Sequence, residues 1–201
     1  MSGRDPILSS LLDDIRKCRI CADFLPRGPR PVLQASDTAR IFVCGQAPGA
    51  RVHETGLPFN DPSGDRLRDW MGVDRATFYD PGRIAIVPMG FCYPGRDARG
   101  GDKPPCPQCA ETWHDRLFDA LPQPALKLVI GRYAQDYHLK GHTGKTLTET
   151  VRNWRDFGGA VIPLPHPSPR NIGWFKRNAW FESEVVPAVR SAVRTILDGQ
   201  A

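Results

Sequence analysis

The sequence predicts an α/β fold, a three-layer α/β/α sandwich with a central, mainly parallel four-stranded sheet. Three observations predict it. Short apolar runs recur along the chain, amphipathic segments with helical spacing lie between and around them, and glycine, proline or both follow each apolar run. Strands that alternate with helices are typical of a parallel sheet covered on both faces. The length of 201 residues suits one domain, which we expect to span residues 1–201.

Four apolar segments are predicted to form the strands. Each is short enough for a buried strand and stops abruptly at a residue that breaks regular structure. The last segment contains Pro163, which argues against a strand there because proline has no N–H for a sheet hydrogen bond. In chain order the predicted strands are residues 39–44, 83–87, 126–130 and 160–164.

Four helices are predicted from apolar residues that recur at helical spacing. The last is the longest, and we expect Pro187 to bend it. The predicted helices cover residues 6–18, 63–73, 109–121 and about 178–197.

The loops that follow the four strands are expected to hold the functional residues, because ligands bind beyond the carboxyl ends of parallel strands. They contain GQAPGARVHETGLPFNDPSG, PMGFCYPGRD, GRYAQ and PHPSPRNIGW. In the last loop, prolines on both sides of His166 restrict the backbone and hold the imidazole at a strand end. Ser168, Arg170 and Asn171 follow it as donors suited to phosphate contacts.

The composition excludes several classes of protein. A hydrophobic fraction of 40% with 24% charged residues is ordinary for a globular chain, neither disordered nor fibrous. No apolar run approaches the roughly 20 residues that span a bilayer, and the start MSGRDPILSS lacks the apolar core of a secretory signal. We therefore expect a cytoplasmic protein without a membrane partner. The formal charge of +5 suits an anionic partner such as nucleic acid, although a basic surface without a dedicated partner explains it equally well.

Three motifs resemble the uracil-DNA glycosylase superfamily. GQAPG after the first strand, TGLPF downstream and HPSPRN after the last strand are similar to its two active-site motifs and its base-stacking phenylalanine, over about residues 18–185. The resemblance is greatest to the iron-sulfur branches, families 4 and 5, which have alanine where other branches place a catalytic Asp or Asn. Ala47 occupies that position here. The resemblance implies a monomeric, monofunctional DNA glycosylase of base excision repair that removes uracil and, with relaxed specificity, hypoxanthine or xanthine.

The resemblance also implies roles for individual residues. His166 would donate to the base oxygen as negative charge develops, and Phe59 would stack on a flipped base unless it packs in the core. Asp61 would handle the water, because a similar acid occupies this stretch in family 5, with His53 and Glu54 as alternatives. The remaining substrate-binding candidates are Gly45, Gln46, Ala47, Pro48, Gly49, Asn60, Ser168, Arg170 and Asn171, and Arg170, Ile172 and Trp174 are candidate wedges for the gap in the base stack.

One departure from the superfamily pattern concerns base selection. Where many members place an asparagine that reads the pyrimidine edge, this sequence has Pro88, which offers no polar side-chain atom. Family 5 also lacks that asparagine and accepts a broader set of deaminated bases. We therefore expect backbone groups and pocket shape to select the base.

The six cysteines favour metal ligation or buried thiols over a disulfide framework, because the chain carries no secretion signal. The spacing of Cys18, Cys21, Cys92 and Cys109 is similar to that of the 4Fe-4S ligands in the iron-sulfur branches, while zinc or reduced thiols without a metal are alternatives. Cys106 could replace Cys109 as the fourth ligand. The remaining cysteine, Cys44, ends an apolar run and is expected in the core.

Two other functions compete with a glycosylase. In a non-catalytic nucleic-acid-binding member of the superfamily, Ala47 and Pro88 would mark lost chemistry. An α/β protein that binds a phosphate cofactor at GQAPG is less well supported, because the motif lacks both the three-glycine fingerprint and a Walker lysine.

Overall fold

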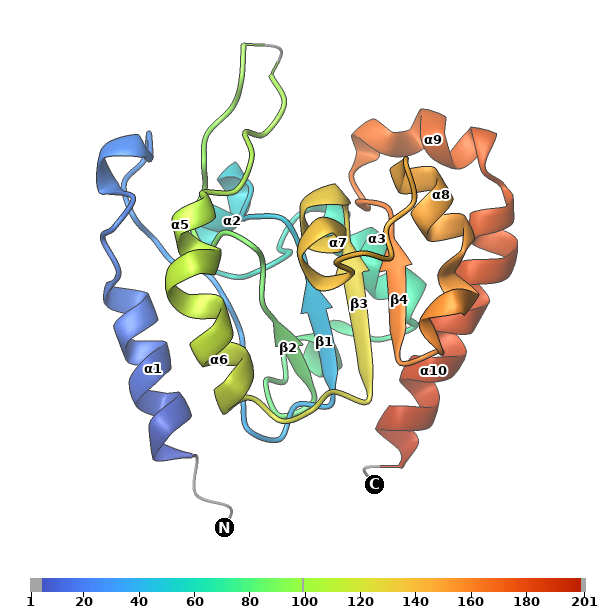
Figure 1. Cartoon of the computed structure of the whole chain (residues 1–201), viewed down its shortest axis with the longest axis horizontal. Coiled ribbons are helices and arrows are strands. Elements are labelled where there is room, and N and C mark those ends of the chain that lie inside the picture. Colours follow the sequence, from blue (N-terminus) through green and yellow to red (C-terminus); the bar gives the residue numbers. More distant parts are fainter. Residues whose placement is uncertain (1–4, 99, 200–201) are drawn as a thin grey trace.

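The computed structural model describes residues 5–98 and 100–199, and a four-stranded parallel sheet forms its centre (Figure 1). The strands are β1 (Ile41–Cys44), β2 (Ile84–Ile86), β3 (Leu126–Ile130) and β4 (Val161–Leu164), in the order β2-β1-β3-β4. All three pairings are parallel, so the carboxyl ends of the strands meet at one edge of the sheet. The structure confirms the predicted fold class and the predicted strands.

β4 tolerates its proline because it lies at the end of the strand order. Pro163 stands opposite Val129 of β3 in the register. An edge strand needs hydrogen bonds to a neighbour on one side, so the missing N–H of proline costs less there than in an interior strand.

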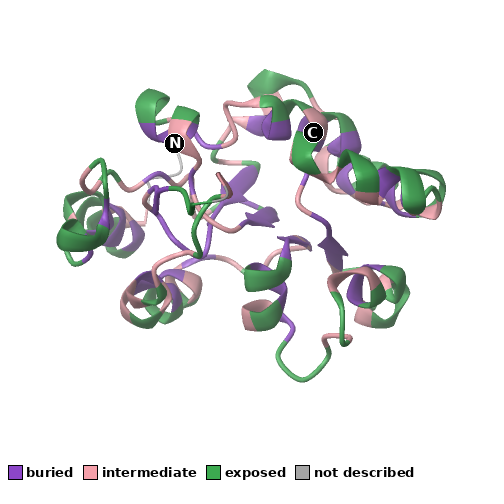
Figure 2. Cartoon of the chain, turned by 90° about the horizontal axis from the view of Figure 1, so that it is seen from above, coloured by how far each residue is buried: buried purple, intermediate pink, exposed green. Residues whose placement is uncertain are grey.

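Helices cover both faces of the sheet, as Figures 1 and 2 show. Alternate residues of β1 point to opposite faces. Ile41 and Val43 join a core cluster with α3 (Pro62–Met71) and α10 (Val186–Asp198), whereas Phe42 and Cys44 join a second cluster with α1 (Pro6–Lys17). The other helices are α2 (Ala50–Thr55), α4 (Arg75–Phe78), α5 (Pro107–Cys109), α6 (Asp115–Ala120), α7 (Arg132–His138), α8 (Leu147–Arg152) and α9 (Ile172–Arg177). Within the described ranges, no helix has the length and apolar character needed to cross a membrane.

The helices differ from the prediction in two ways. The predicted helix over 109–121 begins at Pro107 and contains a π turn, Ala110–His114, and a second π turn, Phe181–Val185, precedes α10. Pro187 lies in the first turn of α10, where its missing N–H is tolerated. In addition, α2, α7 and α9 form in segments that were predicted as loops. Each has only six or seven residues, which is too short for a clear apolar period.

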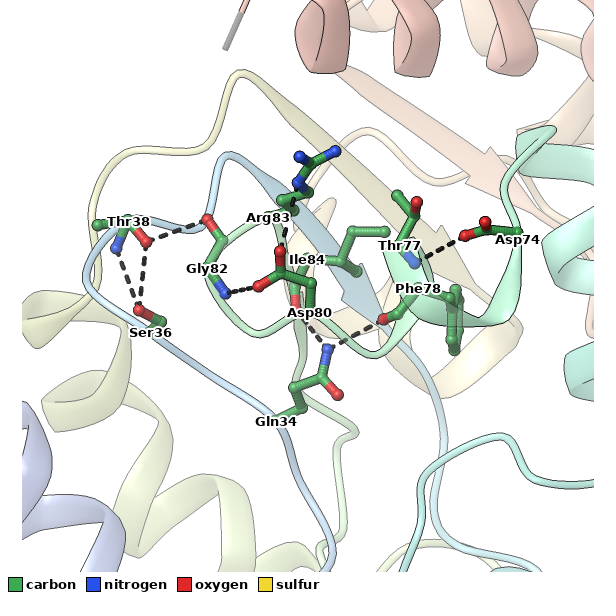
Figure 3. A network of polar contacts seen from close by, with 10 residues as sticks. All are labelled: Gln34, Ser36, Thr38, Asp74, Thr77, Phe78, Asp80, Gly82, Arg83 and Ile84. Carbon is green, nitrogen blue, oxygen red and sulfur yellow. Dashed lines mark hydrogen bonds and ion pairs between the residues drawn. The ribbon is translucent and has the colours of Figure 1, made fainter. Parts of the chain in front are cut away.

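A polar network holds the segment before β1 against the free edge of β2 (Figure 3). Gln34 forms an antiparallel bridge with Ile86, and its side-chain Nε2 donates to the carbonyl oxygens of Phe78 (3.0 Å) and Ile84 (2.7 Å). The carboxylate of Asp80 accepts from Gly82 N (2.9 Å) and closes the turn before β2. These contacts fix the position of Phe78, whose ring packs edge-on against the ring of Phe59.

A buried imidazole, His114, lies between aromatic rings on the α1 side of the sheet. The side chain is fully buried, stacks on Phe91 at 5.4 Å, and makes no hydrogen bond of normal geometry at either ring nitrogen. Burial lowers the pKa of His114 to about 4, although backbone groups of Pro88 and Met89 oppose the shift. Burial likewise lowers the pKa of the neighbouring His138, to about 3.

His114 is expected to make the fold less stable as the pH falls from 6.5 towards 4. In this interval the unfolded chain binds a proton that the folded protein does not, so the contribution is fully present above pH 6.5 and decreases below it. A shift from 6.5 to about 4 corresponds to a loss on the order of 3 kcal/mol. Urea unfolding at pH 7 and pH 4.5 measures the difference, which His114→Phe should reduce. An equal pH dependence in this variant would contradict the assignment.

Candidate active site at the carboxyl ends of the strands

A pocket opens at the carboxyl ends of β1, β2 and β4, where the loops were expected to meet. The pocket is lined by Phe59, Asp61, His166 and Ser168 together with residues 45–49. The structure therefore brings together residues that lie more than a hundred positions apart in the chain. Val32, Val52, Pro58, Ser63, Ile86, Pro88 and Asp102 complete the lining.

The corner at residues 45–49 forms one wall of the pocket and is tied to the segment after β2. The carbonyl oxygens of Gly45 and Gln46 accept from Met89 N and Gly90 N, both at 2.9 Å. Pro88, between β2 and these donors, lines the pocket with a side chain that cannot hydrogen-bond. Ala47 is also apolar, so polar contacts on this wall must come from backbone groups.

Phe59 presents its ring to the pocket from a strained backbone. Its φ of 52° is rare for a non-glycine residue. The ring packs edge-on against Phe78 at 6.3 Å, and a Cβ built on Gly45 would lie 3.3 Å from it. Arg68 Nη1 donates to the Phe59 carbonyl oxygen at 3.3 Å. Phe59 is half-buried and lines the pocket, so the structure places it at the wall where a base could stack.

Gly64 is expected to be essential for the position of Phe59. A Cβ at residue 64 would overlap the carbonyl oxygen of Phe59, and backbone on both sides leaves little room to adjust. We expect Gly64→Ala to lower the free energy of unfolding by on the order of 3 kcal/mol, as overpacked cores do. Gly173→Ala is the glycine control, since residue 173 is exposed on α9 and a Cβ there meets only the flexible end of the Arg177 side chain, at 3.4 Å. Chemical denaturation of both variants measures their free energies of unfolding. Equal values would contradict the close approach of residue 64 to the Phe59 carbonyl oxygen.

His166 is held in one orientation and one tautomer. The backbone N–H of Ser168 donates to His166 Nδ1 at 3.2 Å, so in the neutral ring the proton resides on Nε2. Burial lowers the pKa of His166, while the carboxylates of Asp61 and Asp102 oppose this effect. The ring is therefore neutral at pH 7 and offers Nε2–H as a donor.

Two side chains hold the loop that carries His166. Arg66 Nη1 donates to the carbonyl oxygens of Pro167 (3.1 Å) and Ser168 (3.2 Å), and Asn171 Nδ2 donates to the carbonyl oxygen of His166 (2.8 Å). Asn171, predicted to bind substrate, is thus engaged with the backbone of this loop. The role of Arg66 was missed because its partners lie about a hundred residues away in sequence.

Asp61 both caps a helix and lines the pocket. It is the N-cap of α3, where its Oδ1 accepts from Gly64 N at 2.9 Å. Its other oxygen, Oδ2, faces the corner, because a Cβ built on Gly49 would lie 3.9 Å from it. The cap fixes the carboxylate and leaves Oδ2 directed towards the pocket wall.

Besides Asn171, four predicted catalytic or substrate-binding residues do not line the pocket. Glu54 is 61% exposed and pairs with Arg27 at 2.6 Å. His53 is buried near the ring of Tyr93, and burial lowers its pKa. The other two make polar contacts elsewhere: Asn60 Oδ1 accepts from Arg75, and Arg170 Nη2 donates to Gly100 O. Direct roles for these residues stay predictions.

The cysteines gather around the N-terminal end of α5. Cys21 Sγ lies 2.9 Å from Cys106 Sγ. Cys106, the alternative to Cys109 as fourth ligand, therefore contacts the predicted ligand Cys21. Burial raises the pKa of Cys92 to about 11, and Cys109, Cys18 and Cys106 add to this effect. Among the residues that the structure describes, no three His, Cys, Asp or Glu side chains are placed to hold a metal ion.

Cys44 lies apart from these thiols. Its side chain is fully buried in the core beside α1, as predicted. Burial raises its pKa to about 12.

Comparison with known protein families gives a match over most of the chain. The family model of the uracil DNA glycosylase superfamily matches residues 33–190. This range contains the four strands and all the predicted residues that line the pocket. Cys18 and Cys21 lie outside it.

Proposed function

Because the chain belongs to the uracil DNA glycosylase superfamily, we propose that it is a monofunctional DNA glycosylase that excises uracil and other deaminated bases in base excision repair. Membership in the superfamily supports a hydrolase that acts on DNA. The observation that carries the finer proposal is the neutral His166, whose Nε2–H shares one pocket with Phe59 and Asp61. The aromatic face can stack on a flipped base, the hydrogen-bond donor can stabilise the departing base, and the carboxylate can position a water molecule.

The proposed reaction begins with a nucleotide flipped out of the duplex, because a stacked base cannot reach a pocket of this kind. The base stacks on Phe59 against the corner at residues 45–49. As the bond between C1′ and the base nitrogen breaks, its electron pair leaves with the base. The Nε2–H of His166 then stabilises the negative charge that develops on the base oxygen.

Hydrolysis is completed by a water molecule that attacks C1′. In the proposed mechanism, Asp61 Oδ2 orients this water and accepts its proton, while Oδ1 remains bonded to Gly64 N. The fixed cap is an advantage, since a positioned carboxylate loses little freedom when the water binds.

We propose that the protein accepts several deaminated bases, because the pocket wall has few polar side chains that could select one of them. Ala47 and Pro88 line the pocket without polar side-chain atoms, so backbone groups and shape must discriminate among bases. Excision assays with uracil, hypoxanthine, xanthine and a thymine mismatch in matched duplexes test this. Measurable release of a deaminated purine supports the proposal, and release of uracil alone would contradict it.

We also propose that the thiols around α5 bind a 4Fe-4S cluster, with Cys18, Cys21, Cys92 and Cys109 as ligands. An all-sulfur donor set suits such a cluster, which would link the N-terminal segment to the region after β2. The support is the proximity of the thiols, since Cys21 Sγ lies 2.9 Å from Cys106 Sγ, and Cys109, Cys18 and Cys106 all add to the raised pKa of Cys92. Zinc remains the alternative metal.

The cluster is expected to give a brown protein with about four irons and four sulfides per chain. Cys109→Ser should lower the iron content, whereas Cys106→Ser, the matched control, should retain it. The opposite pattern would make Cys106 the fourth ligand. A colourless protein that contains zinc by elemental analysis would contradict the cluster.

A non-catalytic nucleic-acid-binding protein is the competing function. It predicts binding to duplexes without release of any base. The excision assays above distinguish the two, because only a glycosylase leaves an alkali-sensitive abasic site.

A further inference from the structure

A second acidic side chain, Asp102, reaches the pocket from a segment that the proposed mechanism does not use. Residues 93–98 and 100–105, between β2 and α5, rise above the carboxyl ends of the strands in Figure 1. Asp102 nevertheless lines the same pocket as Asp61 and His166. The sequence offered no sign of this, because Asp102 lies in a glycine-rich stretch without a motif.

Backbone hydrogen bonds shape this segment, which we call the rim loop (residues 93–98 and 100–105). Lys103 N donates to Gly95 O (2.9 Å), Asp97 N donates to Gly101 O (2.8 Å), and an antiparallel bridge joins Arg96 to Asp102. The rim loop is therefore a short hairpin-like structure with a defined position for Asp102.

The rim loop is also tied to the loop that carries His166. Arg170 Nη2 donates to Gly100 O at 2.6 Å, which joins the two loops above the pocket. Both Asp61 and Asp102 counteract the lowering of the His166 pKa, so two carboxylates from different elements act on the same imidazole. Arg96 lies 4.0 Å from Asp102 Oδ1, and both side chains are about half exposed, so this ion pair is weak.

We propose that Asp102 is a second catalytic carboxylate, which stabilises the positive charge on the sugar as the base departs. The inference rests on the proposed glycosylase function. Asp61 is half-buried and fixed against the corner, whereas Asp102 is 47% exposed at the rim. The sugar of a flipped nucleotide stays attached to the strand outside, so it lies nearer the rim than the base does.

The chemistry needs a negative group at this place. When the C1′–nitrogen bond breaks, its electron pair leaves with the base, and C1′ and the ring oxygen share a positive charge until water adds. Asp102 forms no bond in this step. The proton of the attacking water goes to Asp61. Asp61 therefore acts on the water, and Asp102 acts on the positive charge of the sugar.

The test compares Asp102→Asn with Asp97→Asn. Both variants remove one negative charge from the rim loop, and asparagine at 97 retains an acceptor for Gly101 N, which Asp97 Oδ1 bonds at 2.8 Å. We expect Asp102→Asn to slow single-turnover excision of uracil by about 100-fold, as the loss of one preorganised electrostatic contact does. Asp97→Asn should excise at close to the unsubstituted rate. Equal rates in the two variants would overturn the proposal.

A binding measurement distinguishes a catalytic from a structural role. The probes are duplexes with a cationic pyrrolidine or a neutral tetrahydrofuran at the abasic position. The unsubstituted protein and Asp97→Asn should bind the cationic probe more tightly, and Asp102→Asn should lose this preference but still bind the neutral duplex. A preference that persists in Asp102→Asn would overturn the inference while leaving glycosylase function intact. No excision by the unsubstituted protein would overturn the glycosylase proposal, and the inference with it.

Discussion

Replacing His166 by alanine is expected to slow base excision by about 100- to 1,000-fold, the usual cost of removing one donor to a developing oxyanion. The reason is the fixed tautomer, in which Ser168 N–H occupies Nδ1 and Nε2–H remains for the base. Single-turnover rates on a duplex with one uracil measure the effect. Binding to the same duplex should survive, because the ring contributes a hydrogen bond to the departing base and no charge towards phosphates.

A control for the His166 variant is His142→Ala, at an exposed position on the loop after α7. It removes an imidazole without touching the pocket and should leave excision unchanged. If His166→Ala excises uracil at the rate of this control, the assignment of His166 as the oxyanion donor is wrong.

Asp61→Asn is expected to lower excision by on the order of 100-fold or more, within the range for loss of a general base. Asparagine is chosen because it is as good an N-cap as aspartate, so α3 should keep its start and its stability. The variant therefore removes the charge and the proton acceptor at Oδ2 while the bond from Gly64 N can persist.

Asp74→Asn is the matched control for Asp61. Asp74 caps α4 through a bond of 2.7 Å from Thr77 N and does not line the pocket. Equal excision rates in the two variants would show that Asp61 is only a helix cap. If His53→Ala alone abolished excision, the water-handling role would move to His53.

Much of the fold could be predicted because its signals are local. A buried parallel strand is a continuous apolar run, and Gly45, Pro88, Gly131 and Pro165 mark where the four strands end. His166 could be placed in the pocket because it follows a strand directly and prolines restrict its backbone. Residues 45–49 could be placed there for the same reason, since they follow β1.

The remaining parts of the site depend on contacts between distant segments. Asp102 reaches the pocket only because the rim loop folds over the strand ends, and Arg66 supports the His166 loop only after α3 has packed beside it. Nor could the sequence show that Glu54 pairs with Arg27 instead of facing the pocket, or that Cys106 contacts Cys21. No periodicity or motif encodes these pairings, so they become visible only in three dimensions.

The most direct test of the account is excision of a single uracil. A labelled oligonucleotide duplex with one uracil is incubated with the purified chain and then treated with alkali, which breaks the strand at an abasic site. We expect scission at the uracil position, and none in a control duplex with thymine paired to adenine. Binding to the duplex without scission, with uracil and with each of the other deaminated bases, would contradict a glycosylase and favour a non-catalytic DNA-binding protein.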